Sequence, residues 1–338
     1  MYLFSVFTKI LHFLPSELSH LLALKGLKTL HFFGITSIIT KKKNEQNSLS
    51  NKSFFNLANK VGIAAGLDKN GEYIDSLASL GIGFLEVGTV TPKPQKGNPK
   101  PRIFRNGNEK SILNRLGFNN KGVDYLVKNL KKRNTDIIVG SSIGKNFDTP
   151  IEKASEDYIY CLERVYKYSD YIAINISSPN TENLRDLSKV EHLDYLLKII
   201  KSKQDDLSVL FGYRPIFIKI SPDESCEDLN NICNSILKNK IDGIICSNTT
   251  TDHTDPKGLG GISGRPLKKK ATDTLIKVRN LLGDKLPIIA SGGVMSSKDY
   301  LEKIDAGANL VQLYTGFIFE GPKLIDDIVN LDSKVRNT

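Results

Sequence analysis

From residue 61 onward, short apolar runs alternate with longer segments in which apolar residues recur at helical spacing. The helical segments include 151–168, 189–203, 224–238 and 266–282. Eight such β–α units in about 270 residues match the size and count of a closed (β/α)8 (TIM) barrel. A doubly wound open sheet is the alternative, but no G-x-G-x-x-G fingerprint opens the first helix. The predicted strands are 61–65, 83–88, 137–142, 171–176, 215–220, 241–246, 287–291 and 309–314.

Two apolar stripes at helical spacing precede this rhythm, and Pro15-Ser16 separates them. They predict two short amphipathic helices, over residues 3–14 and 18–33. Such helices either pack on the main domain or, flanked by lysines as here, lie in a bilayer interface. We therefore expect three parts: an amphipathic helical extension (1–40), a linker (41–60) and the barrel (61–338).

Composition sets outer limits on these readings. The chain has 338 residues, 40% of them hydrophobic, which is enough for one large core and a small appendage. No apolar run reaches the ~18 residues of a membrane-spanning helix, and the amino terminus lacks the pattern of a secretory signal. The four cysteines contain no C-x-x-C pair, and the five histidines form no ligand-spaced group with them. We therefore expect a reduced compartment and no metal site.

The formal charge is +10, and its distribution is uneven. Residues 1–60 carry eight lysines against Glu17 and Glu45, a net charge of +6, so more than half of the excess lies in the first sixth of the chain. Three interpretations of this local excess of lysines stay open: a solvated surface, attraction to an anionic membrane, and attraction to a nucleic acid.

Polar residues follow strand after strand of the predicted barrel. The fourth strand ends in Asn175-Ile176-Ser177-Ser178-Pro179-Asn180-Thr181, and the sixth in Ser247-Asn248-Thr249. Lys69 follows the first strand, and Lys219 lies inside the apolar fifth, where a lysine indicates a buried anion, a Schiff base or a cofactor partner. The carboxyl ends of barrel strands meet at one rim, so these side chains should converge there.

Glycine-rich loops follow the last two predicted strands, at Ser291-Gly292-Gly293 and Tyr314-Thr315-Gly316, after a further glycine-rich loop at 260–265. Barrels bind phosphate groups through backbone N–H groups at this place. The predicted rim has no histidine at a strand end and no carboxylate pair, which argues against glycoside hydrolysis and histidine-based acid–base chemistry. Amides, two lysines and a phosphate cradle suit a planar carboxylated heterocycle held against FMN.

Ordered segments along essentially the whole chain resemble the dihydroorotate dehydrogenase family, and its membrane-associated, quinone-reducing class 2 in particular. These segments are AAGLDKNGE, GTVTPKPQKGNPKPRIFR, LNRLGFNNKG, IGKNFDTP, INISSPNT, KISPD, SNTT, GGISGRPL and LVQLYTGFIFEGP. The resemblance implies oxidation of (S)-dihydroorotate to orotate in de novo pyrimidine (UMP) biosynthesis. Electrons would pass through FMN to a respiratory quinone. It also implies that residues 1–40 attach the protein peripherally to the cytoplasmic side of a bacterial inner membrane and give the quinone access to the flavin. We expect a monomer, although the sequence does not reveal the oligomeric state.

The resemblance also assigns roles to individual residues. Ser178 stands where class 2 enzymes keep the catalytic base and class 1 enzymes use cysteine, and Thr181 matches a residue that assists it. Arg105 and Tyr314 match the meeting point of quinone and flavin. The substrate ligands implied are Lys69, Asn114, Arg115, Leu116, Gly117, Phe118, Asn175, Asn180, Asn248 and Thr249. The FMN ligands implied are Ala65, Gly66, Lys69, Thr89, Ser142, Asn175, Lys219, Ser247, Gly264, Gly293, Tyr314 and Thr315.

Two positions depart from the family pattern: Ser142 replaces an asparagine common in bacterial relatives, and Ser247 replaces a threonine. Both retain a hydroxyl, so we expect the cofactor site to change only in detail. Two rival readings follow from the same residues. One is a tRNA-dihydrouridine-synthase-like FMN barrel acting on RNA pyrimidines, although the basic excess lies in the apolar extension. The other is a phosphate-binding barrel without chemistry, against which the retained Ser178, Thr181 and asparagines argue.

Overall fold

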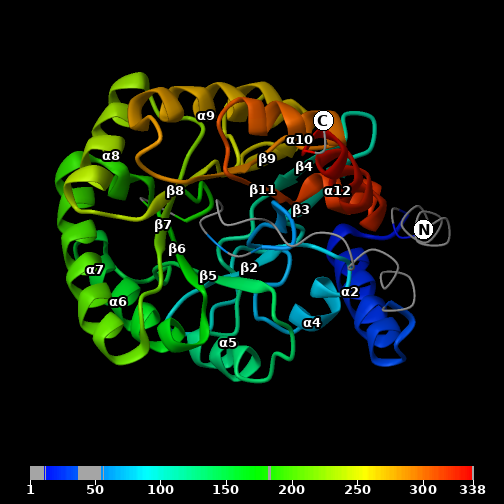
Figure 1. Cartoon of the computed structure of the whole chain (residues 1–338), viewed down its shortest axis with the longest axis horizontal. Coiled ribbons are helices and arrows are strands. Elements are labelled where there is room, and N and C mark those ends of the chain that lie inside the picture. The colour runs from blue at the N-terminus through cyan, green and yellow to red at the C-terminus, as the bar shows by residue number, and fades with distance from the viewer. Residues whose placement is uncertain (1–10, 12, 37–54, 56, 182–183, 337–338) are drawn as a thin grey trace.

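The computed structural model describes residues 11, 13–36, 55, 57–181 and 184–336. Its centre is a closed barrel of parallel strands in the order β1-β11-β10-β8-β7-β6-β5-β2, which confirms the predicted fold class (Figure 1). All eight predicted runs are barrel strands. Their bounds are β1 Val61–Ile63, β2 Phe84–Val90, β5 Ile138–Ile143, β6 Tyr171–Asn175, β7 Ile216–Ile220, β8 Gly243–Cys246, β10 Ile288–Ser291 and β11 Leu310–Leu313.

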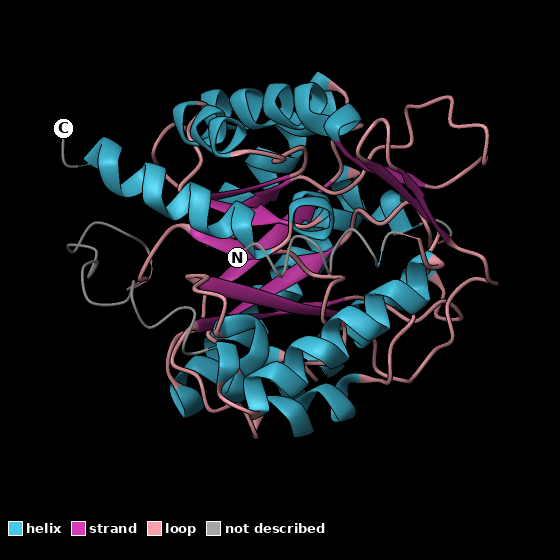
Figure 2. Ribbon diagram, turned by 90° about the vertical axis from the view of Figure 1, so that its right-hand side faces the viewer, coloured by secondary structure: helices cyan, strands magenta, loops and turns pink. Residues whose placement is uncertain are grey.

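Helices surround this barrel, and their apolar faces pack against the outside of the strands (Figure 2). The long helices lie where the apolar periodicity predicts them, and short 3-10 turns extend several of them. The helices are α4 Ile74–Ala78, α5 Val123–Leu130, α6 Ala154–Val165, α7 Val190–Phe211, α8 Cys226–Lys238, α9 Lys268–Leu282, α10 Ser297–Asp305, α11 Thr315–Glu320 and α12 Pro322–Arg336. The turns are η1 Ile151–Lys153, η2 Tyr166–Tyr168, η3 Leu184–Ser188 and η4 Arg265–Leu267.

Inside the barrel, inward-facing residues form layers because side chains alternate with a period of two along each strand. At the amino end of the strands, an apolar cluster includes Phe84, Tyr171 and Phe217, with Phe55 and Leu57 packed against it from outside the strands. Two residues further along β2 and β7, the inward positions are Glu86 and Lys219. The core thus changes from apolar to polar toward the carboxyl ends of the strands.

A second, antiparallel sheet was not predicted. It consists of β3 Ile103–Asn106, β4 Ser111–Asn114 and β9 Gly261–Gly264, in the order β3-β4-β9. The sequence pattern indicated only a long loop before residue 120 and a glycine-rich loop at 260–265. The register pairs Asn114 with Gly261, residues far apart in the chain, so no local pattern could have revealed it.

The extension contributes one described helix, α2 Ser16–Phe32, close to the second predicted stripe. Its Leu24 and Leu27 are buried in the barrel's main core cluster. Most of the first predicted helix (3–14) and most of the predicted linker (41–60) lie outside the described residues. Among the described helices, none has the length and apolarity needed to cross a membrane.

Candidate active site

A cavity of about 970 Å³, its open mouth included, lies at the carboxyl ends of the barrel strands. Residues from the ends of many strands and from the antiparallel sheet line it, so the predicted convergence at one rim is observed. The predicted site residues among its lining are Ala65, Gly66, Lys69, Thr89, Asn114, Leu116, Gly117, Phe118, Asn175, Ser178, Asn180, Lys219, Ser247, Asn248, Thr249, Gly264, Gly293, Tyr314 and Thr315.

The four asparagines of the cavity are organised in two pairs. Asn180 Nδ2 donates to Asn114 Oδ1 (2.9 Å), and Asn114 Nδ2 donates to the Gly261 carbonyl of the antiparallel sheet (3.0 Å). Asn248 Nδ2 donates to Asn175 Oδ1 (3.3 Å), while Asn175 Nδ2 donates to Thr89 (2.9 Å). Asn248 Nδ2 also donates to Ser177 Oγ (3.0 Å), so the second amide hydrogens of Asn114, Asn175 and Asn180 remain for a ligand with ring carbonyls or a carboxylate.

Ser178 lies in the loop that leaves β6 and lines the cavity, with only 6% of its surface exposed. The backbone N–H of Asn180 donates to its Oγ (3.3 Å). An N–H directed at this oxygen stabilises negative charge on it, which favours loss of the serine proton. Thr181, three residues later, is buried, and its Oγ1 has no hydrogen-bond partner among the residues that the structure describes.

The two predicted lysines have different environments. Lys69 Nζ donates to Asn119 Oδ1 (2.6 Å), and removal from water together with the nearby Arg102 lowers the pKa of Lys69 to about 7. Lys219 is buried at the base of the cavity, and its Nζ lies 3.5 Å from Oε1 of the fully buried Glu86. Glu86 is thus the anionic partner that the sequence required for Lys219 without identifying it.

Gly264 and Gly293, from two of the glycine-rich loops predicted to hold a phosphate, line one side of the cavity. A Cβ at Gly293, where φ is +77°, would stand 2.2 Å from the Lys268 Cα, so only glycine lets the two backbones approach. At the base of the cavity, the side chain of Gln312 donates to Glu86 (2.7 Å), and within the described part of the chain its buried Oε1 has no partner. A cationic Lys219, an unpaired amide oxygen and a glycine cradle fit a flavin ring with a phosphate tail.

Three predicted substrate, catalytic or cofactor residues do not line the cavity: Arg115, Ser142 and Thr181. Ser142 lies behind Thr89 and shares a hydrogen bond with its hydroxyl (2.8 Å), so it supports the lining from the second layer. Arg115 lies over the Phe104 ring and donates to the Lys257 carbonyl. Their predicted roles in ligand binding remain predictions.

Other lining residues were not named as individual ligands. Ser291, Gly292 and Gly316 lie in the glycine-rich loops predicted to hold a phosphate, and Pro179 and Ser263 lie in segments that the sequence also singled out, whereas Ala64, Leu267, Val294 and Gln312 were not predicted. Gln312 precedes Tyr314 by two residues, so strand periodicity could have placed it on the same inward face. Ser263 lies on β9, and its hydroxyl accepts a hydrogen bond from Thr315 (2.8 Å). Only the pairing of β9 with β4 brings Ser263 there, and no local signal indicates it.

A second hollow lies between the start of α2 and β3, and Arg105 lines it together with Leu14 and Arg102. Arg105 donates to the Leu14 carbonyl (2.6 Å) and to Ser19 Oγ (3.0 Å), while Glu17 pairs with Arg102 (2.6 Å). These contacts attach α2 to the rim. Arg105 therefore lies in this hollow, whereas Tyr314, its predicted partner at the quinone site, lines the main cavity.

The exposed side of α2 carries several large apolar side chains next to the exposed Lys25 and Lys28. Leu18, Leu21 and Leu22 are each at least 40% exposed, and Phe32 and Phe33 are 83% and 68% exposed. The buried side carries His20, whose pKa is lowered to about 4 by burial and by the charge of Lys69, so the imidazole is neutral. The described residues contain no group of three or more His, Cys, Asp or Glu side chains that could hold a metal ion.

Comparison with known proteins assigns the chain to a family. The family described as dihydroorotate dehydrogenase matches residues 49–333. The chain is 50% identical over 323 residues to the dihydroorotate dehydrogenase (quinone) of Vibrio atlanticus, covering 94% of this chain and 96% of the relative. It is 46% identical to that of Shewanella denitrificans, covering 97% and 98%. The ligand-free DHODH structure from Eimeria tenella superposes with a TM-score of 0.83 at 34% identity, covering 94% of each chain. The chain therefore belongs to the dihydroorotate dehydrogenase family.

Proposed function

We propose that this protein oxidises (S)-dihydroorotate to orotate, the redox step of pyrimidine biosynthesis, with bound FMN as first acceptor and a quinone as second. The relatives that match nearly all of the chain are named dihydroorotate dehydrogenase (quinone). The observation that carries the proposal is the single cavity in which Ser178, the four asparagines and the glycine cradle meet.

The substrate would lie against the amides. Asn114, Asn175, Asn180 and Asn248 offer donors and acceptors to the ring carbonyls and N–H groups, and Lys69 offers a cation to the carboxylate. Thr249 Oγ1 is buried, and none of the described residues hydrogen-bonds to it, which suits a further hydrogen bond to this ligand. Substrate binding would also exclude water from the cavity.

Ser178 would act as the base that removes a proton from C5 of dihydroorotate. A serine hydroxyl is weakly acidic, so it needs stabilisation of the oxyanion and a route for the proton. The Asn180 N–H supplies the first. The buried Thr181 hydroxyl, in the same loop, would supply the route for the proton, through direct contact with Ser178 or through a water molecule.

Residues of this chain would hold FMN by three features. Lys219 and the Gln312 amide would face the ring, the backbone around Gly264 and Gly293 would hold the phosphate, and Tyr314 and Thr315 would close the side of the cavity. FMN bound there would supply the two-electron acceptor that the oxidation requires. Ser142 would support the FMN site indirectly, through its hydrogen bond to the Thr89 hydroxyl.

The extension would connect this site to a membrane. Leu18, Leu21 and Leu22 form an exposed apolar face on α2, and Arg105 ties the start of that helix to the rim. A quinone would approach between α2 and β3, toward Arg105 and Tyr314. In this proposal residues 1–40 are a peripheral attachment to the cytoplasmic face of an inner membrane, 41–60 are a linker, and 61–338 form the catalytic barrel of a monomer.

A direct assay tests the reaction. The purified protein should be yellow, and dihydroorotate should bleach its flavin under anaerobic conditions and drive reduction of a quinone analogue. A colourless protein, or one that oxidises dihydrouridine in RNA instead, would contradict the proposal.

The membrane role needs a separate test. We expect Leu21→Ser combined with Leu22→Ser to impair turnover with a long-tailed quinone in vesicles while leaving turnover with a water-soluble acceptor unchanged. Val209→Ser combined with Leu210→Ser is the matched control, because these residues are 85% and 70% exposed at the far end of α7. Equal losses with both acceptors would mean that α2 has a structural role only.

A further inference from the structure

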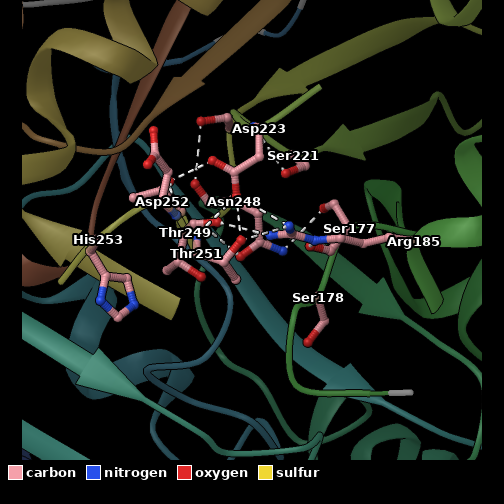
Figure 3. Close-up of polar contacts among 12 residues, drawn as sticks. Ser177, Ser178, Arg185, Ser221, Asp223, Asn248, Thr249, Thr251, Asp252 and His253 are labelled. Atoms are coloured by element: carbon pink, nitrogen blue, oxygen red, sulfur yellow. Dashed lines mark hydrogen bonds and ion pairs between the residues drawn. The ribbon is translucent and has the colours of Figure 1, made fainter. Parts of the chain in front are cut away.

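Arg185 joins the ends of three neighbouring barrel strands (Figure 3). It lies on η3, which follows β6, and its guanidinium contacts residues that follow β6, β7 and β8. Nη1 donates to Asp223 Oδ2 (3.1 Å) and to Thr251 Oγ1 (3.2 Å). Nη2 donates to the Thr249 carbonyl (3.3 Å), and Nε donates to the Ser177 carbonyl (3.4 Å). Arg185 does not line the cavity, so it acts on the site only through these loops.

Asp223 anchors this arrangement. Besides Arg185, its carboxylate accepts hydrogen bonds from the Thr250 hydroxyl and the Thr251 N–H (2.8 Å), and Lys270 Nζ lies 2.7 Å away. Burial alone would raise the pKa of Asp223, but the contacts with Lys270 and Thr250 hold it at about 2. The carboxylate is therefore a permanent anion, held by the loop after β8 and by α9.

Ser177, the residue directly before the proposed base, is held from two sides. Its carbonyl accepts from Arg185 Nε, and its hydroxyl accepts from Asn248 Nδ2 (3.0 Å), an amide of the cavity. Only 1% of its surface is exposed. Fixing this peptide restricts rotation of the next residue, and in Figure 3 the Ser178 hydroxyl points away from the Arg185 cluster. A displacement of about 1 Å between reacting groups can cost about 100-fold in rate.

We propose that Arg185, paired with Asp223, is a positioning residue that holds the Ser177–Ser178 peptide and thereby aims Ser178 Oγ at C5 of the substrate. This inference rests on the proposed function. The shape of the side chain explains the choice of arginine. A planar guanidinium reaches four acceptors on three loops at once, whereas a lysine ammonium would keep the ion pair with Asp223 and lose most of the carbonyl contacts.

The test compares Arg185→Ala and Arg185→Lys with the parent protein in anaerobic stopped-flow experiments. We expect the limiting rate of flavin reduction by saturating dihydroorotate to fall about 100-fold in Arg185→Ala and about tenfold in Arg185→Lys. The dissociation constant for orotate and the flavin content should stay within about threefold, because Arg185 touches neither ligand. Arg164→Ala is the control, since Arg164 also pairs with an aspartate but lies on the outer face of α6.

Two further readouts distinguish positioning from general damage to the fold. The isotope effect with dihydroorotate deuterated at C5 should increase in Arg185→Ala, because the misaligned proton transfer becomes more rate-limiting. Added guanidinium ion should restore part of the rate in Arg185→Ala and none in Ser178→Ala. If Arg185→Ala loses its flavin, the same measurements on Arg185→Lys decide whether Arg185 positions Ser178.

Three outcomes overturn the inference while leaving the reaction itself intact. They are a reduction rate within threefold of the parent, an unchanged isotope effect, or a loss of orotate affinity as large as the loss of rate. A parent protein whose flavin is not reduced by dihydroorotate contradicts the proposed function instead, so the two failures are distinguishable.

Discussion

The two ends of the barrel contrast in the chemistry of their interior. At the amino end, Phe84, Tyr171 and Phe217 fill the space between the strands, and the Tyr171 and Phe217 ring centroids are 5.5 Å apart. At the carboxyl end, hydroxyls, amides and lysines surround an open cavity. The same strands supply both ends: Phe217 and Lys219 are neighbours on the inward face of β7.

Glycine makes the closed end possible. A Cβ at Gly140 would stand 2.1 Å from the Tyr171 ring, and one at Gly243 would stand 2.4 Å from the Phe217 ring. Large and small side chains therefore alternate around the barrel, which lets two aromatic rings fit inside it. Buried polar groups at the carboxyl end lower the stability of the fold, and the apolar packing at the amino end offsets that loss of free energy. Substitutions at the two ends should accordingly differ in what they change.

The largest expected effect is on chemistry at the open end. Ser178→Ala should lower the limiting rate of flavin reduction by dihydroorotate about 1000-fold, since general base catalysis contributes about 100- to 10,000-fold. The melting temperature should stay within about 2 °C, because little packing is lost. Stopped-flow absorbance measures the reduction rate, and thermal denaturation measures the melting temperature. Ser208→Ala, on the outside of α7, is the control for both. A mild loss of rate would show that Ser178 is not the base.

A substitution in the apolar cluster at the amino end of the barrel should change the stability of the protein and leave the reaction rate unchanged. Phe217→Ala should lower the free energy of unfolding by about 3–5 kcal/mol, because it leaves a void beside Gly243 that the neighbouring strands fill only partly. Urea denaturation measures this, and Val209→Ala, at an exposed position, should change it by less than about 0.5 kcal/mol. The rate of flavin reduction per folded molecule should be unchanged. A tenfold fall in that rate would show that the two ends are not independent.

A smaller effect concerns pH. Because burial and Arg102 lower the pKa of Lys69 to about 7, its ammonium is lost as the pH rises through 7. The substrate carboxylate binds the protonated form, so the dissociation constant for orotate should rise about tenfold per pH unit above 7. Flavin difference spectra at a series of pH values measure it. In Lys69→Met, binding should be weak and nearly independent of pH, and the same slope in that variant would exclude Lys69 as the titrating group.

The smallest effect is expected behind the cavity wall. Ser142→Ala removes the hydrogen bond to Thr89, worth about 1 kcal/mol, and should weaken FMN binding about fivefold. Fluorescence titration of the apoprotein with FMN measures it. Ser141→Ala is the adjacent control, because Ser141 bonds to Ser169 away from the cavity. A loss greater than about 50-fold would mean that Ser142 contacts the cofactor directly.

The amino-acid sequence by itself determined the eight strands, the helices between them and the rim on which Ser178, Asn175 and Lys219 meet. These follow from period-two and helical patterns and from the rule that parallel strands end at one edge, all of which are local or topological. The second amphipathic stripe likewise matches α2.

Only the tertiary structure decided three things: the pairing of β3, β4 and β9, the choice of Glu86 as partner of Lys219, and the contacts of Arg185 with three loops. It also placed Ser142 behind Thr89 and Arg105 in a hollow of its own. Each depends on residues distant in the chain, whose approach is set by barrel closure and packing. A periodic pattern records which face a residue takes, but it does not record which residue stands opposite.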